Sequence, residues 1–320
     1  RARVDVPLDP DLLPDARSAA TAEIVAMETG PLTCTAALPG DALQADNRRI
    51  FATEVRERLR VAALGDPGQM RFIEAALNPF EAGDARSTVE VVHREALEEG
   101  VGVDAVIIAG GAFTQDEIGA LRELGKGGTG VLLFADAPER AFQALGFSGV
   151  AIGDPARREQ PVALAELAID RPPLAAFAKP RSGDLSAARF TTVPAVQIDA
   201  GADVTVLARY DDGTPALLDG TVGRGRALLL ATTPDDAWGD LVRMPEFVPL
   251  THRLVTYLAA GTEPTVLPGA PGEATVGVVP GGTVPVQIAG DAGNAVATPG
   301  ESGCWRFSAP AVGAYRVQAE

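Results

Sequence analysis

The chain has 320 residues and a formal net charge of −16 at neutral pH, with a sequence pI near 4.6. This acidic balance disfavours nucleic acid as a partner, because phosphates require a basic surface. No run of about 18 apolar residues occurs, so we expect no membrane-spanning segment within this stretch. The two cysteines, Cys34 and Cys304, are too few for a disulfide framework or a thiolate metal site, and a bridge between them stays open. The sequence begins with Arg1 rather than Met, and we interpret it as a fragment of a longer protein.

Residues 1–58 have the pattern of a small β module. Short alternating stretches, separated by Pro and Gly, occur at Arg3–Pro7, Thr21–Met27, Leu32–Leu38 and Ile50–Val55. Short strands with this punctuation are typical of a β-sandwich. We therefore predict a partial Ig-like sandwich over residues 1–58.

The period of the sequence changes at Leu59, where an α/β domain is predicted to begin. Its clearest part is an apolar run at Ala105–Ala109, a helix from Thr114 to Leu124 and a second apolar run at Val131–Ala135. Thr114 followed by Glu117 forms a capping box for that helix. Apolar runs that alternate with an amphipathic helix indicate a parallel sheet covered on both faces. The strands predicted over residues 59–262 are Leu59–Leu64, Val89–Val92, Ala105–Ala109, Val131–Phe134, Thr205–Arg209, Ala216–Leu218 and Arg226–Ala231. The predicted helices are Gln69–Leu77, Gln115–Leu124 and Glu246–Ala259.

Two further regions complete the predicted organisation. Ser148–Val204 is irregular and rich in Pro and Arg, and we interpret it as an insertion with separate short strands near Arg189–Thr192 and Ala195–Ile198. The Pro/Gly-rich Gly261–Gly272 indicates a linker. Residues 263–320 then return to alternating strands and predict a second small β module.

Ligands of parallel sheets bind beyond the carboxyl ends of the strands, so any site is expected there. Paired carboxylates at that edge could act as acid and base or hold a cation. The structural alternative is that the aspartates cap a loop and that the tryptophan packs. The residues predicted to line this pocket are Gly110, Gly111, Asp136, Asp235, Asp236, Trp238 and His93.

Other candidate sites in the sequence are weaker. His93 and His252 lack the spacing of metal-ligand pairs, so no metal site is predicted. Cys34 lies in an alternating strand, where a buried thiol that acts as a small apolar residue is the common case. The glycine-rich stretches 125–130 and 223–226 do not follow the phosphate-binding pattern, so they predict turns and no cofactor.

Five short motifs, taken in order, resemble those of a family of bacterial envelope proteins. They are Asp41-Ala42-Leu43 with Asp46-Asn47-Arg48, Asp104–Gly111, Asp212-Gly213-Thr214-Pro215, Gly223-Arg224-Gly225-Arg226 leading to Ala231-Thr232, and Phe247-Val248-Pro249-Leu250. Their order and spacing over residues 35–262 are similar to membrane-anchored proteins of the Bat aerotolerance (BatA-like) type. The resemblance implies an extracytoplasmic β module followed by a flavodoxin-like, class I glutamine-amidotransferase-like domain.

The resemblance also implies where catalytic residues would lie. A class I amidotransferase carries its nucleophilic Cys on the turn after the fourth strand, which corresponds to Ala135 in this chain. The His-Pro-Glu that supplies the base corresponds to Thr233-Pro234-Asp235. Gly110-Gly111 correspond to the oxyanion-strand glycines. A thiol nucleophile needs a thiolate and a base within hydrogen-bond reach, and these positions carry neither residue type.

We therefore expect a non-catalytic structural or interaction module, not an enzyme, on the periplasmic side of the bacterial inner membrane. Its partners would be other envelope proteins or domains of the same polypeptide, with the membrane anchor outside this fragment. One alternative is a hydrolase that uses Asp136, Asp235 and His93, which predicts that these side chains converge. Another is a carbohydrate- or peptide-binding module that uses exposed rings of Trp238 and Trp305.

Overall fold

The computed structural model describes residues 29–37, 48–55, 57–79, 87–94, 97, 102–178 and 183–261, and five strands between 274 and 318. The predicted strands at Arg3–Pro7 and Thr21–Met27 lie outside these residues. The chain divides into two compact units, residues 58–264 and a second that comprises 1–57 and 265–320. Within the described part, no helix is long and apolar enough to cross a membrane.

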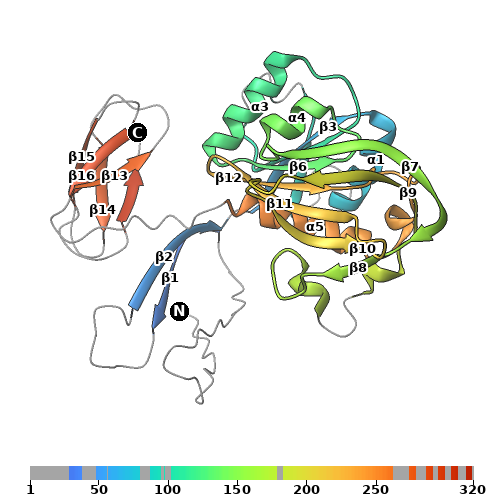
Figure 1. Cartoon of the computed structure of the whole chain (residues 1–320). Coiled ribbons are helices and arrows are strands. Elements are labelled where there is room, and N and C mark those ends of the chain that lie inside the picture. Colours follow the sequence, from blue (N-terminus) through green and yellow to red (C-terminus); the bar gives the residue numbers. More distant parts are fainter. Residues whose placement is uncertain are drawn as a thin grey trace. The chain divides into compact units, whose positions relative to one another are not determined.

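The unit of residues 58–264 is a mixed α/β structure around one eight-stranded sheet (Figure 1). The strand order is β4-β3-β5-β6-β12-β11-β10-β8. The first five of these strands are parallel, and the last three continue the sheet in antiparallel fashion. The strands are β3 (Leu59–Gly65), β4 (Val89–Val92), β5 (Ala105–Ala109), β6 (Gly130–Phe134), β8 (Leu164–Leu167), β10 (Thr205–Tyr210), β11 (Pro215–Val222) and β12 (Gly225–Leu230).

Helices cover both faces of the parallel half, which explains why its central strands are apolar throughout. Every residue of β5 and β6 is buried. Successive residues point to opposite faces, so Ile107 joins the apolar cluster under α1 and α5, and Ile108 joins the cluster under α3 and α4. The helices are α1 (Pro67–Leu77), α3 (Gln115–Gly127), α4 (Glu139–Ala144) and α5 (Phe247–Ala259).

Capping residues fix where the first two helices begin. The Thr114 hydroxyl accepts the Glu117 N–H, and the Glu117 carboxylate accepts the Thr114 N–H, which completes the predicted capping box of α3. In α1 the Asp66 carboxylate accepts the N–H groups of Gly68 and Gln69. The first turn of α1 is thereby held at the carboxyl end of β3.

The insertion between β6 and β12 is more regular than its sequence indicates. β7 (Val150–Val162) and β9 (Phe190–Ile198) pair as a long antiparallel ribbon, with two short 3-10 helices at Leu174–Ala178 and Leu185–Ala187. The two separate short strands predicted in this region are thus one continuous strand, β9. Its partner β7 was not predicted, because only the two ends of that strand are buried and its middle carries Pro and charged residues.

The second unit contains antiparallel sheets. β1 (Gly30–Ala37) and β2 (Arg48–Val55) form a two-stranded sheet, in which Cys34 is a free, half-buried thiol. A five-stranded antiparallel sheet has the order β13-β16-β15-β14-β17. Its strands are β13 (Ala274–Val278), β14 (Val286–Gly290), β15 (Ala295–Pro299), β16 (Cys304–Ser308) and β17 (Tyr315–Gln318).

Candidate functional site at the carboxyl edge of the sheet

Four strand-to-helix or strand-to-loop turns meet at the carboxyl edge of the parallel strands. The turn after β3 is tied to β5 because the Asp66 N–H donates to the Ala109 carbonyl at 3.2 Å. The turn after β6 is tied to the loop after β12 because the Ala135 N–H donates to the Thr232 carbonyl at 3.0 Å. Ala135 itself is buried, with 7% of its surface exposed. The edge is therefore assembled from backbone contacts, and the position predicted for a nucleophile is an inaccessible methyl group.

The polar centre of this edge is a contact between Asp136 and Gln69. The Gln69 Nε2 donates to Asp136 Oδ2 at 2.6 Å, which joins the first turn of α1 to the turn after β6. Both side chains lie directly over Gly110, where a Cβ would come within 2.6 Å of Gln69 Oε1 and 3.4 Å of Asp136 Oδ2. Gly110 also has a φ of +53°. A side chain at this position would push the Gln69 amide aside and would need a left-handed backbone, so glycine is favoured here.

The surroundings of Asp136 favour its neutral form. Burial raises the pKa of the Asp136 carboxyl above its usual value, and the negative charge of Asp235 adds to the rise. Hydrogen bonds from the Gln69 amide and the Gly110 N–H act in the opposite direction, and burial outweighs them. Asp136 Oδ1 and Gln69 Oε1 are both buried, and neither has a hydrogen-bond donor. The raised pKa of the Asp136 carboxyl marks this side chain as the polar centre of the edge.

Asp235 lies close enough to influence Asp136 electrostatically, but its carboxylate is engaged locally. Its Oδ1 accepts the Thr233 hydroxyl at 2.6 Å and the Ala237 N–H at 3.0 Å. The second contact is the loop-capping bond expected of an aspartate in a turn. Thr233 is buried, and its hydroxyl donates a hydrogen bond to this carboxylate.

The remaining predicted residues of the β12 loop are directed elsewhere. Asp236 is paired with Arg243. The Trp238 carbonyl accepts the N–H groups of Thr191 and Thr192 on β9, and its side chain is half-buried. The Trp238 carbonyl thus holds the loop against β9 of the insertion, while Asp236 forms its ion pair within the segment between β12 and α5.

His93 lies outside the aspartate cluster. Its side chain is 63% exposed, and Nδ1 is 3.7 Å from Glu74 Oε1 on α1. His252 is half-buried on α5, with Nε2 3.0 Å from the Ala76 carbonyl, and so connects α5 to α1. Within the residues that the structure describes, no group of three or more metal-ligating side chains comes together.

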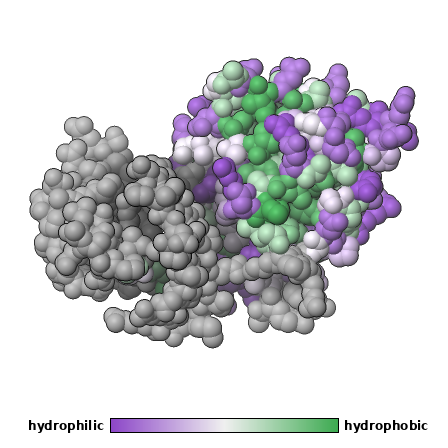
Figure 2. Space-filling model, turned by 60° about the horizontal axis from the view of Figure 1, so that its bottom comes forward, coloured by the Kyte–Doolittle hydropathy of each residue, from purple (hydrophilic) through white to green (hydrophobic). Residues whose placement is uncertain are grey.

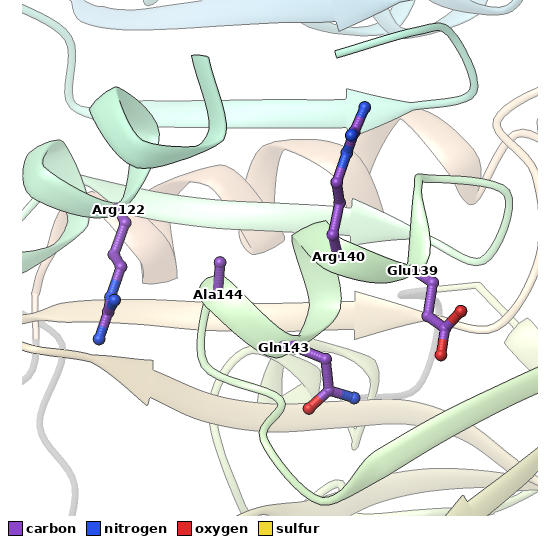
Figure 3. A pocket seen from close by; sticks show the side chains of 5 residues that line it. All are labelled: Arg122, Glu139, Arg140, Gln143 and Ala144. Carbon is purple, nitrogen blue, oxygen red and sulfur yellow. The ribbon is translucent and has the colours of Figure 1, made fainter. Parts of the chain in front are cut away.

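A surface depression lies elsewhere, between α3 and α4 (Figure 3). It has a volume of about 480 Å³ and is open to solvent. The guanidinium groups of Arg122 and Arg140 extend in opposite directions, so they do not form a joint anion site. The residues that line it are Arg122, Glu139, Arg140, Gln143 and Ala144.

A scan against models of protein families finds no match, and neither does a search of curated proteins. Among solved structures, the chain is similar to a cytoplasmic protein from Salmonella typhimurium LT2, at 12% identity over 72% of this chain and 96% of that chain, with a TM-score of 0.45. It is also similar to a ThuA-like protein from Parabacteroides merdae, at 11% identity over 63% and 89% of the two chains, with a TM-score of 0.43. A β-galactosidase from Bacillus circulans is similar at 10% identity over 79% and 41%, with a TM-score of 0.42. Likeness of this degree carries no argument about function.

Gln69 is the site residue that sequence reasoning missed. A glutamine in the first turn of a helix carries no signal of its own, because its amide is common on solvated helix surfaces. Gln69 lies three residues after Asp66 and therefore beside the carboxyl end of β3. This position is the one indication in the sequence that the Gln69 side chain could reach the edge.

Proposed function

We propose that residues 58–264 form a degenerate amidotransferase-like scaffold, which serves as a non-catalytic interaction module in a Bat-type, membrane-anchored envelope protein. Across the sheet, the parallel strands lie side by side in the order β4-β3-β5-β6-β12. When these five strands are numbered along the chain, this order is 2-1-3-4-5, which is the flavodoxin-like order. This order supports the amidotransferase-like assignment. The antiparallel sheets of the second unit suit the Ig-like modules that the resemblance implies.

One observation carries this proposal. The turn after β6, where this fold would present its nucleophile, holds the buried Ala135, and the space over Gly110 is filled by Gln69 and Asp136. An acyl-transfer site needs an accessible nucleophile and open oxyanion donors. In this chain alanine takes the place of the nucleophile, and side chains cover the backbone where the oxyanion donors would lie. The sheet therefore keeps its architecture but lacks the groups that acyl transfer needs. The proposal includes no cofactor and no metal.

An interaction role also needs surface for a partner. Figure 2 shows apolar residues gathered on one face of the 58–264 unit and surrounded by hydrophilic ones. Ile169 and Val248 are large apolar residues of this unit with 44% and 42% of their surface exposed. Apolar surface of this kind is a common mark of protein interaction sites. The partners proposed are other envelope proteins or domains of the same polypeptide, on the periplasmic side of the membrane.

We expect no amide or ester hydrolysis by the 320-residue chain. Glutamine and a panel of chromogenic amides and esters should react at the rate of the protein-free blank, because neither thiolate nor base is in place. Asp235→Ala should leave that background unchanged, as should the exposed control Asp170→Ala. Turnover that exceeds the blank and disappears with Asp235→Ala alone would overturn the proposal.

Protease accessibility tests the proposed periplasmic location. In the source bacterium, protease added to spheroplasts should digest the full-length protein while the inner membrane stays intact, because the proposed module faces outward. A cytoplasmic marker protein in the same sample serves as the control. Protection equal to that of the marker would contradict the periplasmic assignment.

A second candidate, a carboxylate-dependent hydrolase, is favoured by one observation. Asp136 and Asp235 are neighbouring carboxyls in unlike surroundings, and the charge of one raises the pKa of the other. Such pairs supply an acid and a base in many enzymes. His93 has no part in this candidate, because it lies beside Glu74. The hydrolysis measurement above separates the two candidates. The carbohydrate- or peptide-binding alternative has less support, because Trp238 is half-buried and the side chain of Trp305 lies outside the described residues.

A further inference from the structure

The contact between Asp136 and Gln69 leaves two buried oxygens without a hydrogen-bond donor. Gln69 Nε2 donates to one carboxyl oxygen of Asp136, while the other oxygen of each side chain is buried without a donor. Leaving two buried acceptors unsatisfied is costly. A carboxylic acid and a primary amide can satisfy each other in a ring of two hydrogen bonds, in which the amide N–H meets one carboxyl oxygen and the acid O–H meets the amide oxygen. A proton on Asp136 Oδ1 would turn that oxygen into a donor to Gln69 Oε1, and neither oxygen would then remain an unsatisfied acceptor.

The pair joins two elements that are far apart in the sequence. Gln69 lies in the first turn of α1, and Asp136 lies in the turn between β6 and α4. Both cover Gly110 at the end of β5. The contact between them therefore bridges α1 and the turn after β6 over the backbone of Gly110.

We propose that Asp136 and Gln69 form a pH-sensitive latch, an acid–amide pair that closes this edge when Asp136 is protonated and loosens when it ionises. Ionisation removes the proton that links Asp136 Oδ1 to Gln69 Oε1 and leaves a negative charge in a half-buried position near Asp235. The latch does not depend on the amidotransferase-like assignment, because it rests on the contacts of these two side chains alone.

The charged groups around the latch are few. Asp235, in the loop after β12, raises the pKa of Asp136 by its negative charge. Asp66 caps α1, and its carboxylate accepts hydrogen bonds from the N–H groups of Gly68 and Gln69. From the β6 side, Glu139 and Arg140 open α4 and are both exposed at the α3–α4 depression. Burial, the largest influence on Asp136, acts in the same direction as Asp235.

The sign of the pH dependence follows from these contacts. The folded state holds the Asp136 proton more tightly than the unfolded chain, whose aspartates titrate near pH 4. The stability that the latch contributes is therefore fully present below about pH 4 and is lost as the pH rises through the folded-state pKa.

The first measurement is the carbon-13 titration of aspartate carboxyls in the unmodified 320-residue chain, with Asp136 assigned by comparison with Asp136→Asn. We expect the Asp136 midpoint to lie above that of the exposed Asp170. The side-chain amide signals of Gln69 should titrate with the same midpoint, because they share the pair. An Asp136 midpoint at or below that of Asp170, or Gln69 signals that do not follow it, would overturn the latch.

A second measurement uses stability. Asp136→Asn replaces the acid with an amide that can donate to Gln69 Oε1 at every pH, so the latch stays closed. Between about pH 4 and the Asp136 midpoint, the unfolding equilibrium constant of the unmodified chain should rise relative to the variant by up to about tenfold per pH unit. Asp170→Asn should show no such trend. If the ratio of the two unfolding constants stays the same across this range, the proposal is wrong. If Asp136→Asn does not fold, the Asp136 carboxyl signal is assigned by comparison with Gln69→Glu, and the titration alone tests the latch.

Discussion

Gly65→Ala is expected to destabilise the 58–264 unit by about 4 kcal/mol or more, or to prevent its folding. Gly65 ends β3 with a φ of +146°, and a Cβ there would lie 1.7 Å from the Ala109 carbonyl oxygen. The atom in the way belongs to the backbone of β5, so no side-chain rotation can relieve the clash. The two central strands would have to separate at the edge where the candidate site is built. Chemical denaturation followed by far-UV circular dichroism measures the effect, since the α-helices in the described residues all lie in this unit.

Gly213→Ala is the matched control for that variant. Gly213 also has a positive φ, +84°, but a Cβ there has no neighbour within 4 Å. Gly213→Ala should lower the free energy of unfolding by only about 1–2 kcal/mol, which is the cost of a left-handed backbone at alanine. Equal losses for the two variants would show that backbone strain, and not the approach of β3 to β5, accounts for the glycine at position 65.

Tyr210→Ala is expected to cost about 4 kcal/mol of stability. Tyr210 is 1% exposed on β10, and its ring packs edge-on against Phe190 with centroids 5.0 Å apart. Its hydroxyl donates to the Ala231 carbonyl at 2.8 Å, just where the chain leaves β12 for the loop that carries Asp235. Removal of the ring opens a cavity between the insertion and the sheet and also releases the start of that loop.

Tyr210→Phe separates the two contributions. It keeps the ring but leaves the Ala231 carbonyl without its donor, so a loss of about 1–2 kcal/mol is expected. The two variants are compared by the same denaturation measurement. If Tyr210→Phe were as damaging as Tyr210→Ala, the hydrogen bond to the β12 loop, and not the packing against Phe190, would be the main contribution of this residue.

The parallel half of the sheet could be predicted because its signals are local. Ala105–Ala109 and Val89–Val92 are strands over the residues that the apolar pattern indicates. The capping box sets the start of α3 at Gln115. Its end at Gly127 lies three residues beyond the predicted Leu124, because the first part of the glycine-rich stretch predicted as a turn continues the helix and the left-handed Gly128 ends it. A mixed α/β unit with a mostly parallel central sheet was therefore accessible from the sequence.

The insertion could not be predicted in the same way, because its structure depends on partners far away in the chain. β7 is a strand by virtue of pairing with β9, while its own sequence contains Pro155 and Pro161 and exposed charges. Such a strand gives neither the alternation of a half-buried strand nor the apolar run of a buried one.

At the candidate site, the sequence indicated the edge but not its contacts. The placement of Asp136 at the end of β6 follows from the strand pattern, and that of Asp235 follows from the end of β12. The burial that raises the pKa of Asp136 and the partner Gln69 depend on how α1 lies over β5, which no local pattern records. His93 was predicted at the same edge because it follows β4, yet an edge strand leaves its side chain free to turn outward to Glu74.

The position of β12 also has a consequence for how the chain folds. β12 pairs directly with β6, but residues 135–224, which include the insertion, separate the two strands in sequence. Contacts between distant segments form late, because closing a long loop costs entropy before the pairing repays it. We therefore expect this unit to fold slowly, with β3 to β6 assembled first and one edge of β6 open until β12 arrives. An open edge of this kind pairs readily with other chains, so newly made protein should be most prone to aggregate during that interval.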